Sequence, residues 1–482
     1  MPTPADCARS IIDWVGERPL AAVARDLAAL PDGHVLLQAA DTIADAADSD
    51  DEAIRGAGLG ALFGGLVEPL NDGFTPAGRA AYARFFGRIV WRVASRTPTL
   101  LTALAAAGIT SEAALLARHA RIRANTTTLP ADVRRIVVLS RVTIGADILL
   151  SSVVLQRLHQ RFPQAELVLL GDGKLQGLFA GLPKVRVRPI SYARRGPLRE
   201  RLVSWQNVVA AVTEEKADLI VAPDSRLDQL GLLPVGDDAR YLLWENLQGE
   251  GAAPQSLAVL LDGWLARTLA LPASPTVAPR VALDPAADII RGRLRAAFGP
   301  APLAAVKLDH GGNPAKALPK AAEVLILRRL RELGWRILLD RGFGADELAN
   351  SDALLAELGW AAVDIDDSGK GLGRAVGELT PGSLADAPLI RFHGSISGWA
   401  AALATCGHAL SYDSVGHHLA GALGVAVTVA FTGHSDPAFP VAWQPRGRGS
   451  IHVVEIPTAS KQSPQAWRAV LDALPAPTAQ SV

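Results

Sequence analysis

The feature that most constrains the fold is an alternation of short apolar runs with amphipathic segments, which begins at Arg134. The runs at 135–140, 165–170 and 185–189 are rich in Val, Ile and Leu, and the segments between them carry apolar residues at helical spacing. Strands separated by helices of about 10–15 residues are typical of βαβ units and of a parallel sheet. We therefore expect an α/β fold from this point of the chain onward.

A second α/β series follows a proline-rich stretch. Residues 270–285 contain Pro272, Pro275, Pro279 and Pro285, which predicts an interdomain linker. Beyond it, we expect strands at 304–308, 336–339, 408–412 and 425–431, and helices at 320–333, 398–405, 417–423 and 463–474. Two Rossmann-like halves would then face one cleft, and the ligands of such sheets bind beyond the carboxyl ends of the strands.

The first 128 residues lack strand-like alternation. Apolar residues recur there at helical spacing, and caps or breakers such as Thr3-Pro4 and Thr75-Pro76 separate the segments. The helices that this pattern predicts lie at 5–15, 20–30, 34–47, 52–67, 76–95 and 111–122. The predicted domains are 1–128 (all-α), 129–275 and 276–460 (the two Rossmann-like halves) and 461–482 (a closing helix and tail). No residue of the helical domain is assigned a chemical role.

Composition and charge exclude several classes of protein. The chain has 482 residues with 48 Lys+Arg and 48 Asp+Glu, whereas a dedicated nucleic-acid binder needs a basic surplus. Cys7 and Cys406 are too few for a disulfide framework or a cysteine-cluster metal site. Charges interrupt the first 30 residues, and the most apolar stretch, 398–433, contains Asp413, histidines and glycines, so neither a signal peptide nor a membrane span is predicted. We expect a cytoplasmic protein, which is compatible with a homo-oligomer.

The turn after the first strand is the first candidate site. Residues 143–147 (Thr-Ile-Gly-Ala-Asp) follow a buried strand and open a helix, whose amides and dipole attract negative charge. Asp147 either caps this helix or acts as a general base at the edge of the cleft. The turn lacks the GxGxxG pattern, which argues against a NAD enzyme.

The turn at 307–319 in the second half is a candidate phosphate site. Its glycine pair, Gly311 and Gly312, allows the backbone to approach a ligand closely, and Lys316 carries a charge suited to phosphate. A surface loop with a solvated lysine gives the same pattern. The turn therefore indicates a site only in combination with others.

The turn at 411–420 is the third candidate. Ser414, Gly416 and the amides after Ser414 lie where a strand ends and a helix begins, which forms an anion cradle. Asp413 and His418 lie at its rim, and a buried polar cluster is costly unless it is satisfied, so a functional role is favoured over a structural one. Several histidines fall between positions 393 and 434, but without an HExxH pattern or a cysteine pair, so no metal site is predicted.

Together these turns resemble, in chain order, the motifs of glycosyltransferase family nine, the ADP-heptose heptosyltransferases of GT-B fold. That family has a Gly-Asp turn before an apolar helix, a Lys-x-Trp-Pro motif, an Asp-Ser-Gly-x-x-His-Leu-Ala motif and a Phe-Gly-x-Thr-x-Pro tail. The segments similar to these motifs are 145–150 with 161–163, 316–319, 413–424 and 431–437. The resemblance covers residues 134 to about 460, and the helical domain lies outside it.

The resemblance implies a GT-B fold and a reaction. The reaction would be the inverting, metal-independent transfer of a sugar, with ADP-heptose as donor, to a hydroxyl of a small-molecule or glycan acceptor. The nucleotide-diphosphate sugar would be a co-substrate, and no cofactor, metal or nucleic acid would be needed. Asp147 would take the acceptor proton, Lys316 would neutralise the leaving diphosphate, and Ser414 would hold the phosphates. The other donor-side positions are Gly311, Gly312, Glu347 (at the ribose), Gly394, Asp413, Gly416 and His418.

Fewer residues indicate the acceptor side of the site, and the departures from the family pattern favour one alternative function. Asp224, Arg226 and Gln229 follow a strand of the first half and are candidate acceptor contacts. The departures from the family pattern are an inserted Ala146, Leu318 in place of tryptophan and Val415 in place of glycine. They support the alternative of a non-catalytic GT-B-like protein that binds a nucleotide or a partner, with the helical domain recruiting that partner.

Overall fold

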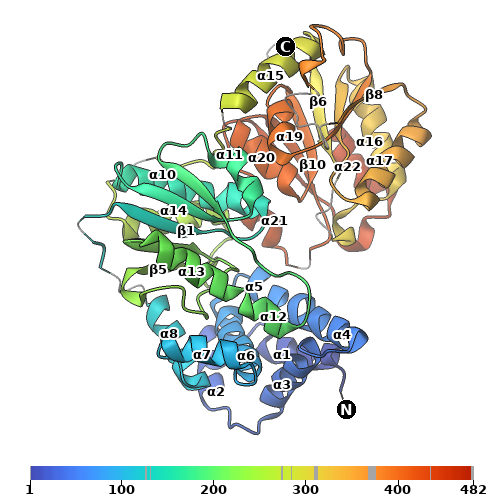
Figure 1. Cartoon of the computed structure of the whole chain (residues 1–482). Coiled ribbons are helices and arrows are strands. Elements are labelled where there is room, and N and C mark those ends of the chain that lie inside the picture. Colours follow the sequence, from blue (N-terminus) through green and yellow to red (C-terminus); the bar gives the residue numbers. More distant parts are fainter. Residues whose placement is uncertain are drawn as a thin grey trace.

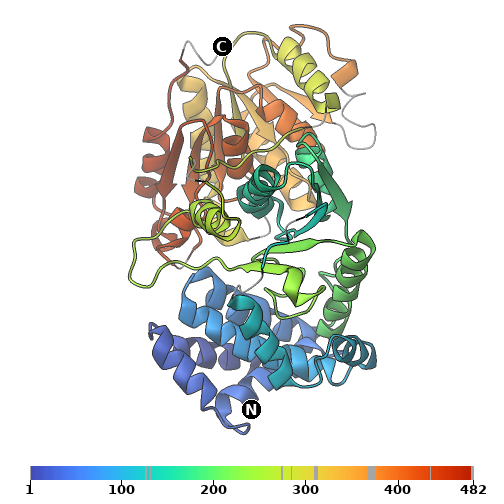
Figure 2. The ribbon, with the colours of Figure 1, turned by 90° about the vertical axis from the view of Figure 1, so that its left-hand side faces the viewer.

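The computed structural model describes residues 2–124, 128–130, 132–272, 275–283, 285–308, 313–366, 376–434 and 436–478. Three regions follow one another along the chain: a helical region, a first sheet with its helices and a second sheet with its helices (Figure 1). In the view turned by 90°, the first sheet lies between the helical region and the second sheet (Figure 2). Every helix in these ranges is too short or too polar to span a bilayer.

The helical region confirms the helical prediction for the start of the chain. It consists of α1 (Pro4–Val15), α2 (Leu20–Ala28), α3 (Val35–Ala47), α4 (Glu52–Leu62), η1 (Phe63–Val67), α5 (Glu68–Asp72), α6 (Pro76–Ala94), α7 (Pro98–Ala106) and α8 (Glu112–Arg123). The side chain of Asp51 caps α4 and that of Thr75 caps α6. The sequence pattern missed α5 and α7. The last residues of the helix predicted at 52–67 form the π-helical turn η1, which continues α4 into α5.

The first sheet has five parallel strands in the order β3-β2-β1-β4-β5, as the α/β prediction requires. They are β1 (Arg135–Leu139), β2 (Glu166–Gly171), β3 (Val185–Pro189), β4 (Leu219–Pro223) and β5 (Tyr241–Trp244). Its helices are α9 (Ile144–Ala146), η2 (Asp147–Ser151), α10 (Ser152–Arg161), η3 (Gly173–Leu175), α11 (Gln176–Phe179), α12 (Leu198–Val203), α13 (Trp205–Glu215), η4 (Asp238–Arg240) and α14 (Leu257–Thr268).

The second sheet has seven parallel strands in the order β12-β11-β10-β6-β7-β9-β8. They are β6 (Leu303–Lys307), β7 (Arg336–Asp340), β8 (Ala362–Asp366), β9 (Leu389–His393), β10 (His408–Tyr412), β11 (Ala426–Phe431) and β12 (Ile451–Glu455). Its helices are α15 (Pro285–Phe298), η5 (Pro314–Lys316), α16 (Lys320–Glu332), α17 (Ala345–Leu358), α19 (Ile396–Leu403), α20 (Val415–Leu423), α21 (Phe439–Ala442), η6 (Thr458–Ser460) and α22 (Pro464–Asp472).

Two continuous cores join the three regions. Phe86 of α6 and Ile122 of α8 are buried in one core with Leu243 of β5 and other side chains on the same face of the first sheet. A second core contains the opposite face of that sheet, including Val138, together with side chains of the second half such as Trp399. The helical region is therefore packed directly against the first sheet, and the helical turns α9, η2 and α11 of the first half contact α20 and α19 of the second half.

Each sheet has a point at which the strand order reverses. In the first sheet the reversal lies between β1 and β4, and in the second it lies between β6 and β10. Loops leave such a point in opposite directions and open a crevice at the carboxyl ends of the strands. Because α20 contacts α9 and η2, the turns after these four strands surround one junction between the halves.

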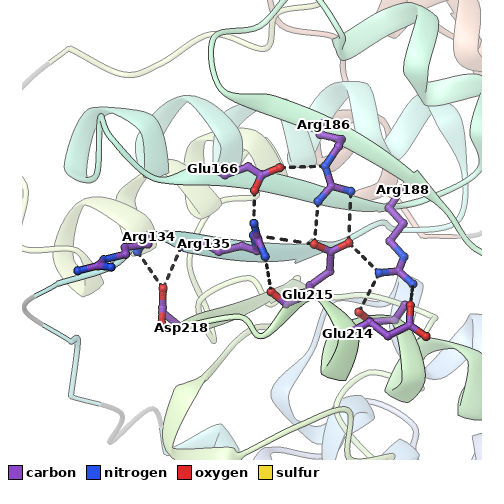
Figure 3. A network of polar contacts seen from close by, with 9 residues as sticks. Arg134, Arg135, Glu166, Arg186, Arg188, Glu214, Glu215 and Asp218 are labelled. Carbon is purple, nitrogen blue, oxygen red and sulfur yellow. Dashed lines mark hydrogen bonds and ion pairs between the residues drawn. The ribbon is translucent and has the colours of Figure 1, made fainter.

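Ion pairs connect the strands of the first sheet near their amino-terminal ends (Figure 3). Glu215, at the end of α13, pairs with Arg186 and Arg188 of β3 at 2.7 Å each. Glu166 of β2 pairs with Arg135 at 2.8 Å and with Arg186 at 2.9 Å. Since β3 is an edge strand, its charged side chains hinder pairing with another chain. This network stabilises the fold and lies at the ends of the strands that are opposite to the junction.

Candidate active site

Asp147 lies in the turn after β1, and its carboxylate is enclosed. It is 1% exposed and accepts hydrogen bonds from Ser140 Oγ (2.6 Å), Ser151 Oγ (2.6 Å) and the amide of Arg141 (2.8 Å). Burial raises the pKa of Asp147, and these three donors oppose that shift. As placed, Asp147 orders the turn, and it would have to release one donor to take a proton from an acceptor.

The π-helical turn η2 begins at Asp147 and accommodates Ala146, the residue that is inserted relative to the family pattern. A π turn contains one residue more than an α turn, so Ala146 fits without changing the winding of α10. Gly145 faces the second half, because a Cβ there would lie 3.1 Å from His418 Cδ2 and 3.4 Å from Val415 Cα. This glycine therefore permits the close approach of α20.

Arg141 and Asp224 connect the turns after β1 and β4. Arg141 Nη1 donates to both the carboxylate and the carbonyl of Asp224, and Arg79 of α6 donates to the same carboxylate at 2.5 Å. Arg79 also binds Asn246. Val142 and Asp224 adopt left-handed φ values of 77° and 54°, which cost about 1–3 kcal/mol each. Such strain persists only where surrounding contacts enforce it, and it is common at functional sites.

The predicted acceptor-side residues have different surroundings. Asp224 is 1% exposed and is held by two arginines. Gln229 donates to the Tyr192 hydroxyl at 2.7 Å, and its carbonyl accepts from the Tyr82 hydroxyl at 3.2 Å. The half-buried side chain of Arg226 has no hydrogen bond or ion pair within the described ranges. Of the three, Arg226 is therefore the residue available to a ligand.

The turn between α5 and α6 brings the helical region to the same junction. Phe74 is buried with a φ of 51°, and its ring lies 6.3 Å from the ring of Phe439 in α21. Figure 1 shows α5 at the edge of the helical region that faces α21. Asp72, which ends α5, is half-buried, and burial raises its pKa to about 6 against the opposing charges of Arg226 and Arg141. The helical region thus places a carboxyl group beside the acceptor-side residues.

Lys316 lies at the switch point of the second sheet, in the turn η5. Its Nζ pairs with the carboxylate of Asp413, at the end of β10. The segment is fixed from one side by Lys461 Nζ, which donates to the carbonyl of Ala315 at 2.9 Å. From the other side Gly433 packs on it: its φ is 79°, and a Cβ would lie 2.5 Å from the carbonyl carbon of Ala315. Only glycine fits there, so Gly433 helps to position Lys316.

Ser414 caps α20. Its hydroxyl accepts from the amide of Gly416 at 3.3 Å, and its amide donates to His417 Nδ1 at 3.0 Å. Gly416 faces the interior, where a Cβ would lie 2.7 Å from Ser411 Oγ. Burial lowers the pKa of His418 well below its ordinary value, so its imidazole is neutral. The start of α20 therefore offers a helix dipole and a hydroxyl to an anion, beside a neutral imidazole.

Aromatic rings of α21 and its flanks link the two halves. Lys316 Nζ lies 5.6 Å from the ring centre of Phe439, on which His434 stacks at 5.9 Å. The guanidinium of Arg141 lies 5.6 Å from the ring centre of Trp443. The rings of Phe439 and Trp443 are 6.3 Å apart. One aromatic cluster is therefore in contact with cations from both switch points.

A cavity of about 280 Å³ is lined by Ala317 and Leu318, which follow Lys316 in the chain, at the carboxyl ends of β6 and β7. Glu347, Glu323 and Asn350 form part of its polar wall. Glu347 accepts from two backbone amides at the start of α17, at 2.6 and 2.9 Å. Burial raises the pKa of Glu323 to about 7. The volume is close to the lower limit of roughly 300 Å³ for ligand pockets.

The structure brings Lys316, Asp413, Ser414 and His418 together, as the motif order predicts. Gly394 follows β9 at the same edge of the sheet. Gly311 and Gly312 lie outside the described residues. Where side chains are described, no group of three His, Cys, Asp or Glu residues could hold a metal ion.

Several buried polar atoms without a hydrogen-bond partner lie on the elements that meet at the junction. Within the described part of the chain they include Arg141 Nε, Asn246 Nδ2, His418 Nδ1, Thr432 Oγ1 and Trp443 Nε1. Buried polar groups are nearly always paired, because an unpaired group loses its hydration without compensation. Their presence here fits a site that receives a polar ligand.

Sequence reasoning missed the residues that the helical region and α21 contribute. Asp72, Phe74 and Arg79 lie in a region to which no chemistry was assigned. One signal was present, because Arg79 occupies an otherwise apolar face of α6 and is fully buried. Phe439 and Trp443 are spaced four residues apart, which places two aromatic rings on one side of a short helix.

No family model and no curated protein matches this sequence. Solved structures with a similar arrangement include a glycosyl transferase family 9 protein from Veillonella parvula DSM 2008 (14% identity, TM-score 0.48, 67% of this chain and 86% of that one). Others are E. coli ADP-heptose lps heptosyltransferase II (15%, 0.45, 70% and 99%) and E. coli heptosyltransferase WaaC with ADP (16%, 0.47, 70% and 98%). Because these TM-scores are below 0.5, the assignment of the architecture depends on the order and direction of the strands in this chain and not on the similarity.

Proposed function

We propose that this chain is an inverting glycosyltransferase, which transfers a sugar from a nucleoside-diphosphate sugar to an acceptor hydroxyl without a metal ion. The family resemblance nominates ADP-heptose as the donor. One observation carries the proposal: the two switch points meet at one junction. Lys316 and the start of α20 come from one side, and the Arg141–Asp224 pair comes from the other.

The second half would bind the donor. A diphosphate at the start of α20 would meet the helix dipole, the Ser414 hydroxyl and Lys316, whose Nζ would exchange Asp413 for phosphate. Asp413 would then accept hydrogen bonds from the sugar hydroxyls. The nucleoside would extend into the cavity at the carboxyl ends of β6 and β7, where the carboxylate of Glu347 can accept from the ribose.

Transfer would be a single displacement that inverts the anomeric carbon. The acceptor oxygen bonds to this carbon as the bond to the β-phosphate oxygen breaks, and the acceptor proton passes to a carboxylate. Lys316 and the helix dipole would neutralise the charge that develops on the leaving diphosphate. The resemblance assigns the proton to Asp147, which requires this side chain to release one of its three donors.

A panel of ADP-, GDP-, UDP- and dTDP-sugars tests the proposal. We expect donors with one particular base to raise the Tm and to release nucleoside diphosphate. Lys316→Met should weaken binding of that nucleoside diphosphate by about tenfold or more in calorimetry, since a charge contact of about 1.4 kcal/mol is lost. Lys184→Met is the matched control, because Lys184 is an exposed lysine before β3 at the opposite edge of the first sheet. A panel without stabilisation or release would contradict the proposal.

A nucleotide-binding protein without transferase activity is the second candidate. One observation favours it: Asp147 is saturated by three donors, and Lys316 is paired with Asp413. Such a protein would bind nucleoside diphosphates and leave the sugar in place. Thermal stabilisation by a nucleotide sugar, with no nucleoside diphosphate released over hours at high protein concentration, would support this candidate over the enzyme.

A further inference from the structure

The helical region is fixed at the junction by the turn that follows Asp72. The carbonyl of Phe74 accepts from the amide of Gln248 in the first half at 2.9 Å. The ring of Phe74 packs on Phe439 of the second half, with 6.3 Å between ring centres. Both halves therefore hold the segment that carries Asp72.

The carboxyl group of Asp72 lies among charges but is not paired with any of them. The charged groups around it are Arg226, Arg141, Asp224, Glu68 and, beside the next residue, Asp436. Across the ranges that the structure covers, the side chain of Asp72 forms no hydrogen bond or ion pair. Burial raises its pKa to about 6, so the group changes its protonation near neutral pH, as an efficient general base does.

Three other carboxylates of the junction, those of Asp147, Asp224 and Asp413, are occupied, and a fourth, that of Asp436, accepts from the amide of Ala438 at 2.7 Å. Asp147 accepts from three donors and is 1% exposed. Asp224 is bound by Arg79 and Arg141. Asp413 is bound by Lys316 on the donor side. Asp147, Asp224 and Asp413 would each have to break an existing contact before accepting a proton, and Asp436 orders the turn before α21 through one carboxylate oxygen. The carboxyl group of Asp72 has no such contact.

We propose that Asp72 is the catalytic base of this reaction and that the helical region thereby completes the acceptor side of the active site. Asp147 is then a positioning residue that shapes the turn after β1. The assignment rests on the proposed glycosyl transfer and gives the helical region a role in it. Arg226, whose side chain has no hydrogen bond or ion pair in the described structure, would orient the acceptor beside Asp72.

The chemical step balances without a further reactant. The carboxylate of Asp72 accepts the proton of the acceptor hydroxyl while the hydroxyl oxygen bonds to the anomeric carbon. The bond between that carbon and the β-phosphate oxygen breaks, and its electron pair leaves with the nucleoside diphosphate. Asp72 afterwards returns the proton to water.

The first test measures turnover in the full chain with the nucleotide sugar that stabilises it most in the panel. Asp72→Asn should lower the rate of nucleoside-diphosphate release by about 100-fold or more and change the affinity for the nucleoside diphosphate less than twofold. Asp13→Asn is the matched control, because it removes the charge of an exposed aspartate on α1 of the same helical region that is not among the charged groups around Asp72, and its rate should equal that of the wild type. Asp147→Asn should lower the Tm together with the rate, because the turn loses a hydrogen bond.

A second test is independent of activity. The pKa of Asp72 lies above its ordinary value of 3.8, so ionisation disfavours the folded state, and stability falls as the pH rises from about 4 to about 6. Asp72→Asn should therefore have a higher Tm than the wild type at pH 8, and this difference should disappear toward pH 4. Asp13→Asn, which removes an exposed carboxylate that does not act on Asp72, should follow the wild-type curve.

The outcomes separate the two proposals. A wild-type rate in Asp72→Asn would overturn the role of Asp72 and leave glycosyl transfer intact, as would an Asp147→Asn variant that keeps its Tm and loses turnover while Asp72→Asn retains it. Parallel Tm curves for Asp72→Asn and the wild type would overturn the placement of this carboxyl at the junction. A wild-type chain that turns over no nucleotide sugar would overturn the proposed function itself.

Discussion

Arg79 of the helical region and Asp224 of the first sheet form a buried ion pair, with 2.5 Å between Nη2 and Oδ1 and side-chain exposures of 0% and 1%. The pair is 145 residues apart in the sequence. Asp224 is also bound by Arg141, so one carboxylate connects the helical region with the turns after β1 and β4. The helical region is therefore joined to the candidate active site by charge as well as by apolar packing.

Replacing Arg79 should destabilise the whole chain. Arg79→Ala would leave a buried carboxylate with one cation fewer, and removing one partner of a buried pair costs about 3–5 kcal/mol. We expect this loss in denaturant unfolding followed by tryptophan fluorescence. Arg9→Ala, at an exposed arginine of α1, should change stability by less than about 0.5 kcal/mol. Equal midpoints for the two variants would show that the pair contributes nothing.

Gly433 should be required for nucleotide binding although it lies outside the donor site. In Gly433→Ala, the new Cβ would lie 2.5 Å from the backbone of Ala315 and would displace the segment that carries Lys316. We expect the affinity for the nucleoside diphosphate to fall by about tenfold or more, equivalent to about 1.4 kcal/mol, in isothermal titration calorimetry.

The control for this variant is Gly359→Ala. Gly359 ends α17 with a similar φ of 66°, but a Cβ there meets nothing within 4 Å. Both substitutions therefore strain the backbone, and only Gly433→Ala moves Lys316. Equal loss of affinity in both variants would attribute the effect to backbone strain alone.

The strands that the sequence predicts and those that it misses differ in their place in the sheets. Central strands such as β1 and β6 are buried on both faces and appear as continuous apolar runs. The missed strands β5, β8 and β12 are all edge strands, which are short or carry polar residues. In β9, a buried arginine conceals the strand, because Arg391 pairs at 2.7 Å with Asp364 of the neighbouring β8. Such a pair is visible only once the two strands are adjacent.

The residues of the candidate site also differ in whether the sequence predicts that they lie close together. Lys316, Asp413 and Ser414 follow predicted strands, and parallel sheets bring the carboxyl ends of their strands to one edge, so their proximity follows from the sequence. Asp72 and Arg79 reach the junction through the packing of helices on the first sheet. Their partners lie far along the chain, and helical periodicity predicts which face of a helix is buried but not what it is buried against.

Because of the ion pairs near the amino-terminal ends of its strands, the first sheet should lose stability at acidic pH (Figure 3). Hydrogen bonds from Arg186 and Arg188 hold the pKa of Glu215 below its ordinary value of 4.5. A lowered pKa contributes stability that is present above pH 4.5 and is lost as the pH falls further. Glu215→Gln should therefore cost about 2 kcal/mol at pH 7, and its difference from the wild type should narrow below pH 4.5. Glu214→Gln, at the exposed neighbouring residue, should show a smaller effect, and equal effects would contradict the prediction.

Glu323 should have the opposite pH dependence. It is 3% exposed, accepts from the Tyr412 hydroxyl at 2.8 Å, and has a pKa raised by burial from 4.5 to about 7. A raised carboxyl pKa means that stability falls as the pH rises from about 4.5 to about 7, by up to about 3 kcal/mol. Glu323→Gln keeps the acceptor for Tyr412 and removes the charge, so its Tm should exceed that of the wild type at pH 8 and approach it at pH 5. Glu332→Gln, at an exposed residue at the end of the same helix, should follow the wild-type curve of Tm against pH. If the Tm curve of Glu323→Gln runs parallel to that of the wild type, Glu323 is ionised without a cost in stability.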